Sequence, residues 1–125
     1  MSVRNLLTFN AIFALLIAVV LIISPSTLAG YFQIGTERVA LQLIQLFGAA
    51  SVGYGFSSWL MRGAGPSEAR TAFLRGGGAG YIVVAIVTGF TVINGLGSPI
   101  IWVGVALVIF LGVLFLALAR LPDSG

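Results

Sequence analysis

Residues 100–119 read IIWVGVALVIFLGVLFLALA, a run of 20 residues without a charged side chain. Trp102 is the one residue in this run whose side chain can form a conventional hydrogen bond. As a helix, the run would be about 30 Å long, which matches the thickness of the hydrocarbon core of a bilayer. The run therefore predicts a helix that crosses a membrane.

Three further apolar runs precede this one, and we predict membrane-spanning helices over residues 6–23, 39–61, 67–93 and 100–119. In the third helix, Ser67 is the expected N-cap, and the strongly apolar part covers residues 79–93. Apolar residues make up 59% of the chain and charged residues 7%, against roughly a quarter charged in soluble domains. The runs lack the alternation of barrel strands, so helices are the expected spanning structure.

The 125 residues leave room for one domain, which we predict to cover the whole chain, 1–125. Short connections between the runs make sequential helices antiparallel neighbours. We therefore expect an all-α fold, a membrane-spanning four-helix bundle with up-down-up-down topology.

Positive charge is distributed unevenly between the two ends of this bundle. The formal net charge of +3 arises from six arginines against Glu37, Glu68 and Asp123. If the spans alternate, only Arg38 falls on one side, and five arginines fall on the other: Arg4, Arg62, Arg70, Arg75 and Arg120. Since positively charged loops stay in the cytoplasm, we predict that both termini are cytoplasmic. The arginines occur singly rather than in a basic stripe, so nucleic acid is not an expected partner.

The first run and the segment after it each allow an alternative. Arg4 and the small residues Thr27-Leu28-Ala29 fit a cleaved signal peptide, but the run exceeds about 15 residues and three spans follow, so we expect it to be retained. Residues 24–38 place Tyr31 and Phe32 among glycine and polar residues. We expect an interfacial loop or short helix here, with a lid over an outward-facing pocket as the alternative.

Ionisable side chains are missing from the apolar part of every run, and the chain contains neither His nor Cys. Intramembrane ionisable residues mark proton relays, ion pathways and ligand sites, while imidazoles and thiolates hold most transition metals. The sequence therefore predicts no catalytic residue, no cofactor and no metal site. We do not expect an enzyme.

Uncharged polar residues gather in the second and third runs. Gln42 and Gln45 share a helix face with Arg38 near the outer surface. Their expected partners at the same end of the third run are Thr88, Thr91 and Asn94. We interpret these residues as interhelical contacts, with a polar pocket for a headgroup or small ligand as the alternative.

Asn10 is the most polar residue of the first run. An amide that faced lipid would lack hydrogen-bond partners, so Asn10 is expected to point into the bundle. Its expected partners on the second run are Tyr54, Ser57 or Ser58.

Small residues recur four apart in the two middle runs, at Ala49 and Gly53, Ser51 and Gly55, Gly76 and Gly80, and Ala85 and Gly89. This spacing lets helix backbones approach closely, either within the bundle or against another subunit. We predict that the two middle runs form the tight centre. The last run, apolar on every side, is expected to be the most exposed to lipid or to a partner.

Several turn and packing residues carry a likeness to a known group of proteins. Asn10 lies in an apolar first helix that is followed by Ser24-Pro25 and by Tyr31-Phe32-Gln33-Ile34-Gly35. Leu46-Phe47-Gly48-Ala49-Ala50 leads through Gly55 to Trp59-Leu60-Met61-Arg62, and Asn94-Gly95-Leu96-Gly97 precedes the last helix. Over nearly its whole length, the chain resembles small bacterial four-helix integral membrane proteins of uncharacterised function. The resemblance implies this topology and the bacterial inner membrane, and no activity.

The leading functional expectation is a non-enzymatic integral membrane protein that serves as an accessory or structural subunit of a larger membrane complex. Its expected partners are the lipid bilayer and other membrane protein subunits or itself. One alternative is a small homo-oligomeric transporter or channel for a neutral solute, with a path lined by Gln42, Gln45, Thr88 and Thr91. Another is a protein that binds a lipid, quinone or carotenoid beside Phe47, Tyr54, Phe56 and Trp59.

Overall fold

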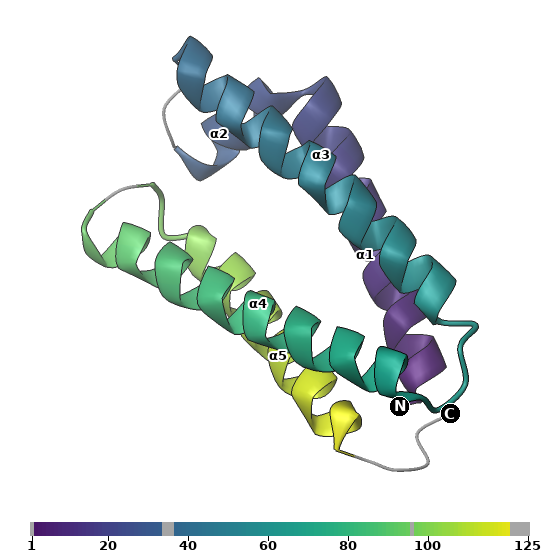
Figure 1. Ribbon diagram of the computed structural model, residues 1–125. Coiled ribbons are helices and arrows are strands. Elements are labelled where there is room, and N and C mark those ends of the chain that lie inside the picture. The colour runs from purple at the N-terminus through teal and green to yellow at the C-terminus, as the bar shows by residue number, and fades with distance from the viewer. Residues whose placement is uncertain (1, 34–36, 96, 121–125) are drawn as a thin grey trace. The chain divides into compact units, whose positions relative to one another are not determined.

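The computed structural model describes residues 2–33, 37–95 and 97–120 of the chain. These residues form five helices: α1 (Val3–Ile23), α2 (Pro25–Phe32), α3 (Arg38–Met61), α4 (Glu68–Ile93) and α5 (Ile101–Ala119) (Figure 1). By length and composition, α1, α3, α4 and α5 could each cross a membrane, with mean hydropathies of 2.9, 1.4, 1.8 and 2.9. The all-α prediction is confirmed for the described part of the chain.

The four long helices lie within a few residues of their predicted bounds, and α1 differs the most because it begins at Val3. The hydroxyl of Ser2 accepts a hydrogen bond from the Asn5 amide at 3.1 Å. A serine at this position satisfies an amide of the first turn, which has no partner within the helix. The helix therefore starts ahead of its apolar run.

The connection between the first two spans contains the short helix α2, one of the structures expected for residues 24–38. Pro25 stands in its first turn, where the missing amide is tolerated. Gln33 ends the helix in a left-handed conformation (φ 55°), and its amide donates to the Gly30 carbonyl at 3.2 Å. The lid alternative stays a prediction.

Some residues used in the sequence argument lie outside the described part of the chain: Ile34, Gly35, Leu96 and Asp123.

The chain divides into two compact units, each of which is described by itself. One unit comprises residues 7–63, and the other comprises residues 1–6 together with 64–125. The first contains most of α1 with α2 and α3, and the second contains the start of α1 with α4 and α5. The single transmembrane domain over residues 1–125 stays a prediction.

In the unit of residues 7–63, α1 packs antiparallel on α3 through glycines. A Cβ atom added to Gly48 would lie 2.8 Å from the Cβ of Leu21, and one added to Gly55 would lie 2.8 Å from the Cγ of Leu15. Real Cβ atoms do not approach other carbons so closely, so only glycine fits at these two positions. The two backbones lie close together as a result.

In the second unit, α4 and α5 pack antiparallel in the same manner. A Cβ on Gly78 would lie 2.7 Å from the Cγ of Leu116 and 3.1 Å from the Gly112 carbonyl oxygen. The rings of Tyr81 and Phe115 meet edge to face, with centroids 5.6 Å apart. The buried residues of α4 include Leu74, Gly78, Ala85 and Gly89. These positions follow the three-and-four spacing of helices that cross at a shallow angle.

The predicted small-residue pairs are only partly used within these helix pairs. Gly55 contacts α1, and a Cβ on Gly89 would meet Trp102 at an ordinary distance of 3.8 Å. The other predicted glycines, Gly53, Gly76 and Gly80, have no described neighbour within 4 Å of such a Cβ, and Ala49 is exposed. A spacing of four residues identifies helix faces that carry small side chains. It does not identify which of these faces packs on a neighbouring helix.

The last helix is more buried than the sequence suggests. In the structure, 33% of the apolar span of α5 is buried, compared with 11% for α4, which reverses the predicted ranking. The stripe of α4 that meets α5 consists mainly of small residues, so its larger side chains point elsewhere; Val83 and Phe90 are exposed. On α5, the large residues Leu111 and Phe115 are fully buried. A tight centre formed by α3 and α4 stays a prediction.

Candidate functional site

A buried polar contact joins α1 to α3. The Asn10 side-chain amide donates a hydrogen bond to the Ser58 hydroxyl, with an N–O distance of 2.7 Å. Both residues are fully buried. The prediction that Asn10 points inward to a serine of this helix is confirmed. Tyr54, another predicted partner, is half-buried on α3.

Gln45 makes a second polar contact between the same two helices. Its side-chain amide donates to the Ile22 carbonyl oxygen at 3.0 Å. This carbonyl belongs to the last turn of α1, whose acceptors have no partner within the helix. Gln45 thereby caps the end of α1. This hydrogen bond stabilises the helix end because no water is present in a bilayer core to bond the free carbonyl group. Gln42, one turn earlier on α3, is exposed.

The polar residues of α4 bond to their own helix. Thr88 donates to the Val84 carbonyl at 2.7 Å and Thr91 donates to the Val87 carbonyl at 3.0 Å, while Asn94 is exposed at the end of the helix. Threonine satisfies its hydroxyl in this way inside a helix. Contacts from these residues to Gln42 and Gln45, and a polar pocket that they would share, stay predictions.

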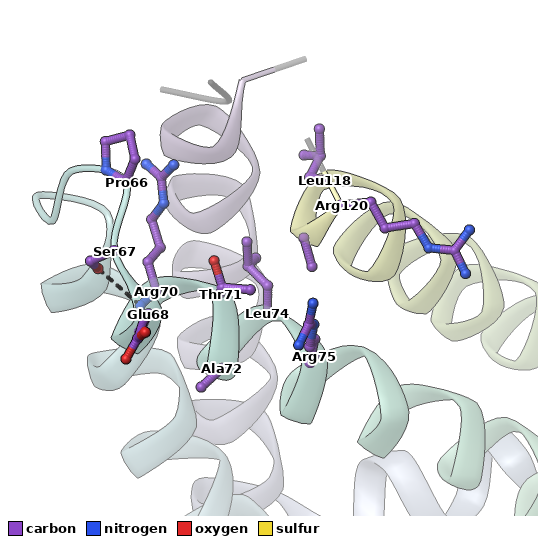
Figure 2. A pocket seen from close by; sticks show the side chains of 11 residues that line it. Pro66, Ser67, Glu68, Arg70, Thr71, Ala72, Leu74, Arg75, Leu118 and Arg120 are labelled. Carbon is purple, nitrogen blue, oxygen red and sulfur yellow. Dashed lines mark hydrogen bonds between the residues drawn. The ribbon is translucent and has the colours of Figure 1, made fainter. Parts of the chain in front are cut away.

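The strongest candidate for a ligand site lies where α4 begins and α5 ends. This pocket has a volume of about 530 Å³. We call it the arginine pocket; it is lined by Pro66, Ser67, Glu68, Arg70, Thr71, Ala72, Leu74, Arg75, Leu118, Ala119 and Arg120. Figure 2 shows Arg70 and Arg120 on opposite sides of the pocket, with Arg75 between them.

The helix ends position these arginines. The hydroxyl of Ser67 accepts a hydrogen bond from the Arg70 amide at 3.1 Å, which caps the start of α4 (Figure 2). Arg70 is only 5% exposed, and its guanidinium donates to the Ala64 carbonyl at 3.4 Å. Arg120 follows the last residue of α5, where a cation interacts favourably with the negative end of the helix dipole. Arg75 and Arg120 are both exposed.

The arginine pocket has the chemistry of an anion site. Three arginines and one acidic residue, Glu68, line it. Guanidinium groups bind phosphate and carboxylate groups through paired N–H donors. Leu74 and Leu118 add apolar walls to this charged lining. Among the described residues, no group of three His, Cys, Asp or Glu side chains could hold a metal ion.

Another cation is held at the end of α3. The Arg62 guanidinium carbon lies 3.6 Å from the centre of the Trp59 ring, which is a cation–π contact. Phe47, Phe56 and Trp59 are exposed on α3, and none of them lines the arginine pocket. The groove expected beside these aromatic residues stays a prediction.

Sequence reasoning used Arg70, Arg75 and Arg120 only to orient the spans and did not bring them together. Residues 76–93 and 101–119 are apolar stretches of nearly equal length on consecutive helices. Antiparallel packing of two such stretches places Arg75 and Arg120 at the same end. This signal was present in the sequence and would have identified two of the three cations.

Comparison of the chain with protein-family models, with curated proteins and with solved structures finds no match.

Proposed function

We propose that this protein is a non-enzymatic subunit of a larger complex in a bacterial inner membrane. In this proposal α1, α3, α4 and α5 cross the membrane as an up-down-up-down bundle with both termini in the cytoplasm. The four apolar helices support the membrane location, and the uneven distribution of arginines supports the orientation. The resemblance to small bacterial four-helix membrane proteins supports the bacterial inner membrane.

The observation that carries the subunit role is the surface of α4. Gly76 and Gly80 lie one turn apart, and no described atom lies within 4 Å of a Cβ added to either. Neither glycine is needed for packing on α5, which uses Gly78. Small residues at this spacing let a second helix approach the backbone closely. A helix of another subunit, or of a second copy, would fit against this face.

Native purification from membranes tests this proposal. The protein is extracted in a mild detergent, and proteins that co-migrate with it are identified by mass spectrometry. The proposal predicts a reproducible partner, or a homo-oligomer, that is lost in the double variant Gly76→Leu/Gly80→Leu. Leucine at these two positions fills the small face, and its Cβ has no neighbour on α5 within 4 Å.

Gly104→Leu is the matched control. Gly104 lies on α5 with open space around its Cβ position, but Ile100 and Val108 stand four residues to either side. This variant should retain the partner. Reproducible isolation of the protein as a lone monomer, or equal behaviour of the two variants, would refute the subunit role.

The transporter or channel alternative gains no support from the described contacts. A neutral path lined by Gln42, Gln45, Thr88 and Thr91 needs polar groups directed at a solute. The hydroxyls of Thr88 and Thr91 and the side-chain amide of Gln45 each donate to a main-chain carbonyl oxygen, and Gln42 is exposed. We therefore retain the subunit role as the proposed function.

A further inference from the structure

We propose that the arginine pocket binds the phosphate group of an anionic phospholipid. The site is distinct from the packing surface on Gly76 and Gly80, and it gives the protein a lipid ligand that the subunit role does not include. The side of the membrane that supplies the lipid follows from the proposed topology. The binding depends on the lining of the pocket and on the membrane-spanning placement of α4 and α5, and not on the subunit role.

The lengths of α4 and α5 place the pocket at the depth of lipid headgroups. From Arg75 to the end of α4 at Ile93 the helix rises about 27 Å, and α5 from Ile101 to Ala119 rises about the same distance. Both values match a hydrocarbon core of about 30 Å. Arg75 and Arg120 therefore stand together at one boundary of that core.

The first turns of α4 extend beyond this boundary. Glu68 to Arg75 adds about 10 Å of helix. The headgroup regions bring the total bilayer thickness to about 40–45 Å, so this part of α4 crosses the layer that contains the lipid phosphates. Arg70, Arg75 and Arg120 line the pocket at this level.

The charges in the pocket favour an anion over a zwitterion. Three arginines line the pocket with a single acidic residue, Glu68. The start of α4 adds the positive end of a helix dipole, which attracts phosphate groups. A headgroup whose phosphate charge is not neutralised by its own ammonium group would interact most strongly with this surface.

The size of the pocket also suits a lipid headgroup. Leu74 and Leu118 line the pocket beside the arginines but are almost fully buried, so the exposed lining consists mainly of the more polar residues. The volume of about 530 Å³ lies within the range of small-molecule sites, about 300–1,000 Å³.

Native mass spectrometry of the detergent-purified protein tests this proposal. The protein is incubated with equal amounts of phosphatidylglycerol and phosphatidylcholine, and the retained lipids are identified from their masses. Wild-type protein is expected to retain phosphatidylglycerol at least fivefold more than phosphatidylcholine. Removing one arginine near anionic lipid weakens binding about fivefold. We expect that loss for Arg75→Gln and for Arg120→Gln, and about 25-fold for the double variant.

Arg38→Gln is the control for charge. Arg38 is exposed at the start of α3 and does not line the arginine pocket, so its removal changes the net charge equally. This variant should retain phosphatidylglycerol within twofold of wild type. Thermal unfolding of each variant verifies folding, because Arg75 and Arg120 are exposed and their removal should lower the midpoint only slightly. An equal loss in all three single variants, or no preference in the wild type, would overturn the proposal.

Inorganic phosphate distinguishes the two possible sources of the phosphate group. Protein loaded with phosphatidylglycerol is exposed to increasing inorganic phosphate, with sulfate at the same ionic strength as the control. Lipid that stays bound at millimolar phosphate supports the phospholipid assignment. Specific displacement by phosphate, together with phosphate adducts that the double variant lacks, would overturn it in favour of a free phosphate ion.

Discussion

Replacing Gly78 with alanine tests the close approach of α4 and α5. The new Cβ would lie 2.7 Å from the Cγ of Leu116 and 3.1 Å from the main-chain oxygen of Gly112. Contacting carbon atoms prefer a separation of about 3.5–4.0 Å. Leu116 Cγ is a branch point and the Gly112 oxygen is part of the backbone, so the clash is relieved only if the helices move apart.

The expected cost follows from two opposing effects. Overpacking a fitted interface by one methyl group costs about 1–3 kcal/mol. Alanine offsets part of this cost, because its helix propensity exceeds that of glycine by about 1 kcal/mol. Gly80→Ala on the same helix provides the control, since no described atom lies within 4 Å of its added Cβ. Relative to Gly80→Ala, Gly78→Ala should therefore lower the free energy of unfolding by about 1–3 kcal/mol.

Unfolding in mixed micelles of a mild detergent and sodium dodecyl sulfate measures this difference. Circular dichroism follows the loss of helix as the fraction of dodecyl sulfate increases. Gly78→Ala should unfold at a lower fraction than wild type, and Gly80→Ala at the same or a higher fraction. Equal midpoints for the two variants would refute the close packing at Gly78.

The same assay tests the polar contacts between α1 and α3. Ser58→Ala removes the acceptor of the Asn10 amide and should lower the free energy of unfolding by about 1 kcal/mol, whereas Ser57→Ala, whose hydroxyl bonds to its own helix at Gly53, should change it by less than about 0.5 kcal/mol. If Ser58→Ala and Ser57→Ala lower the free energy of unfolding equally, the hydrogen bond between Asn10 and Ser58 does not stabilise the protein. Gln45→Leu should cost about 0.6 kcal/mol through the loss of the bond to Ile22, and Gln42→Leu, which removes an exposed side chain, should not destabilise the protein. A destabilisation by Gln42→Leu as large as that by Gln45→Leu would contradict the capping role. Arg62→Gln should change the emission of Trp59 in a Trp102→Phe background, because the cation lies over that ring; an unchanged spectrum would contradict the contact.

The long helices could be predicted from the sequence because their signals are local. Charge-free runs long enough to cross a bilayer, flanked by arginine, proline and glycine, define each span without reference to its neighbours. The buried Asn10 was predictable for a similar reason, since an amide in an apolar helix has few places where it can be satisfied. The short helix α2 was predictable only as one of two alternatives, because its eight residues carry little periodic signal.

The surfaces by which the helices pack on each other were harder to predict, because they depend on how one helix is positioned along and around its neighbour. Gly78 is flanked by Gly76, Gly77 and Gly80, and a spacing of four residues singled out Gly76 and Gly80. Only the position of α5 shows that Gly78 and Gly112 meet. Gly48 and Gly55 stand seven residues apart. This heptad spacing repeats over two turns of helix, so it indicates the face that packs on a neighbour more reliably than a single spacing of four residues does.

The arginine pocket required tertiary information for a different reason. Arg70 and Arg120 are 50 positions apart in the chain, and only antiparallel packing of α4 and α5 brings them to one site. The orientation of the spans accounted for these arginines, and the near-equal lengths of residues 76–93 and 101–119 would have brought only Arg75 and Arg120 together.

Labelling of single cysteines tests the membrane-spanning topology most directly. The chain contains no Cys, so Ser26→Cys on α2 and Gly65→Cys between α3 and α4 each provide one thiol. Both positions are exposed, and a Cβ at Gly65 has open space around it. In intact spheroplasts, a membrane-impermeant maleimide should label Ser26→Cys at once and Gly65→Cys only after the membrane is permeabilised. Labelling of Gly65→Cys in intact spheroplasts, with Ser26→Cys protected, would contradict the account.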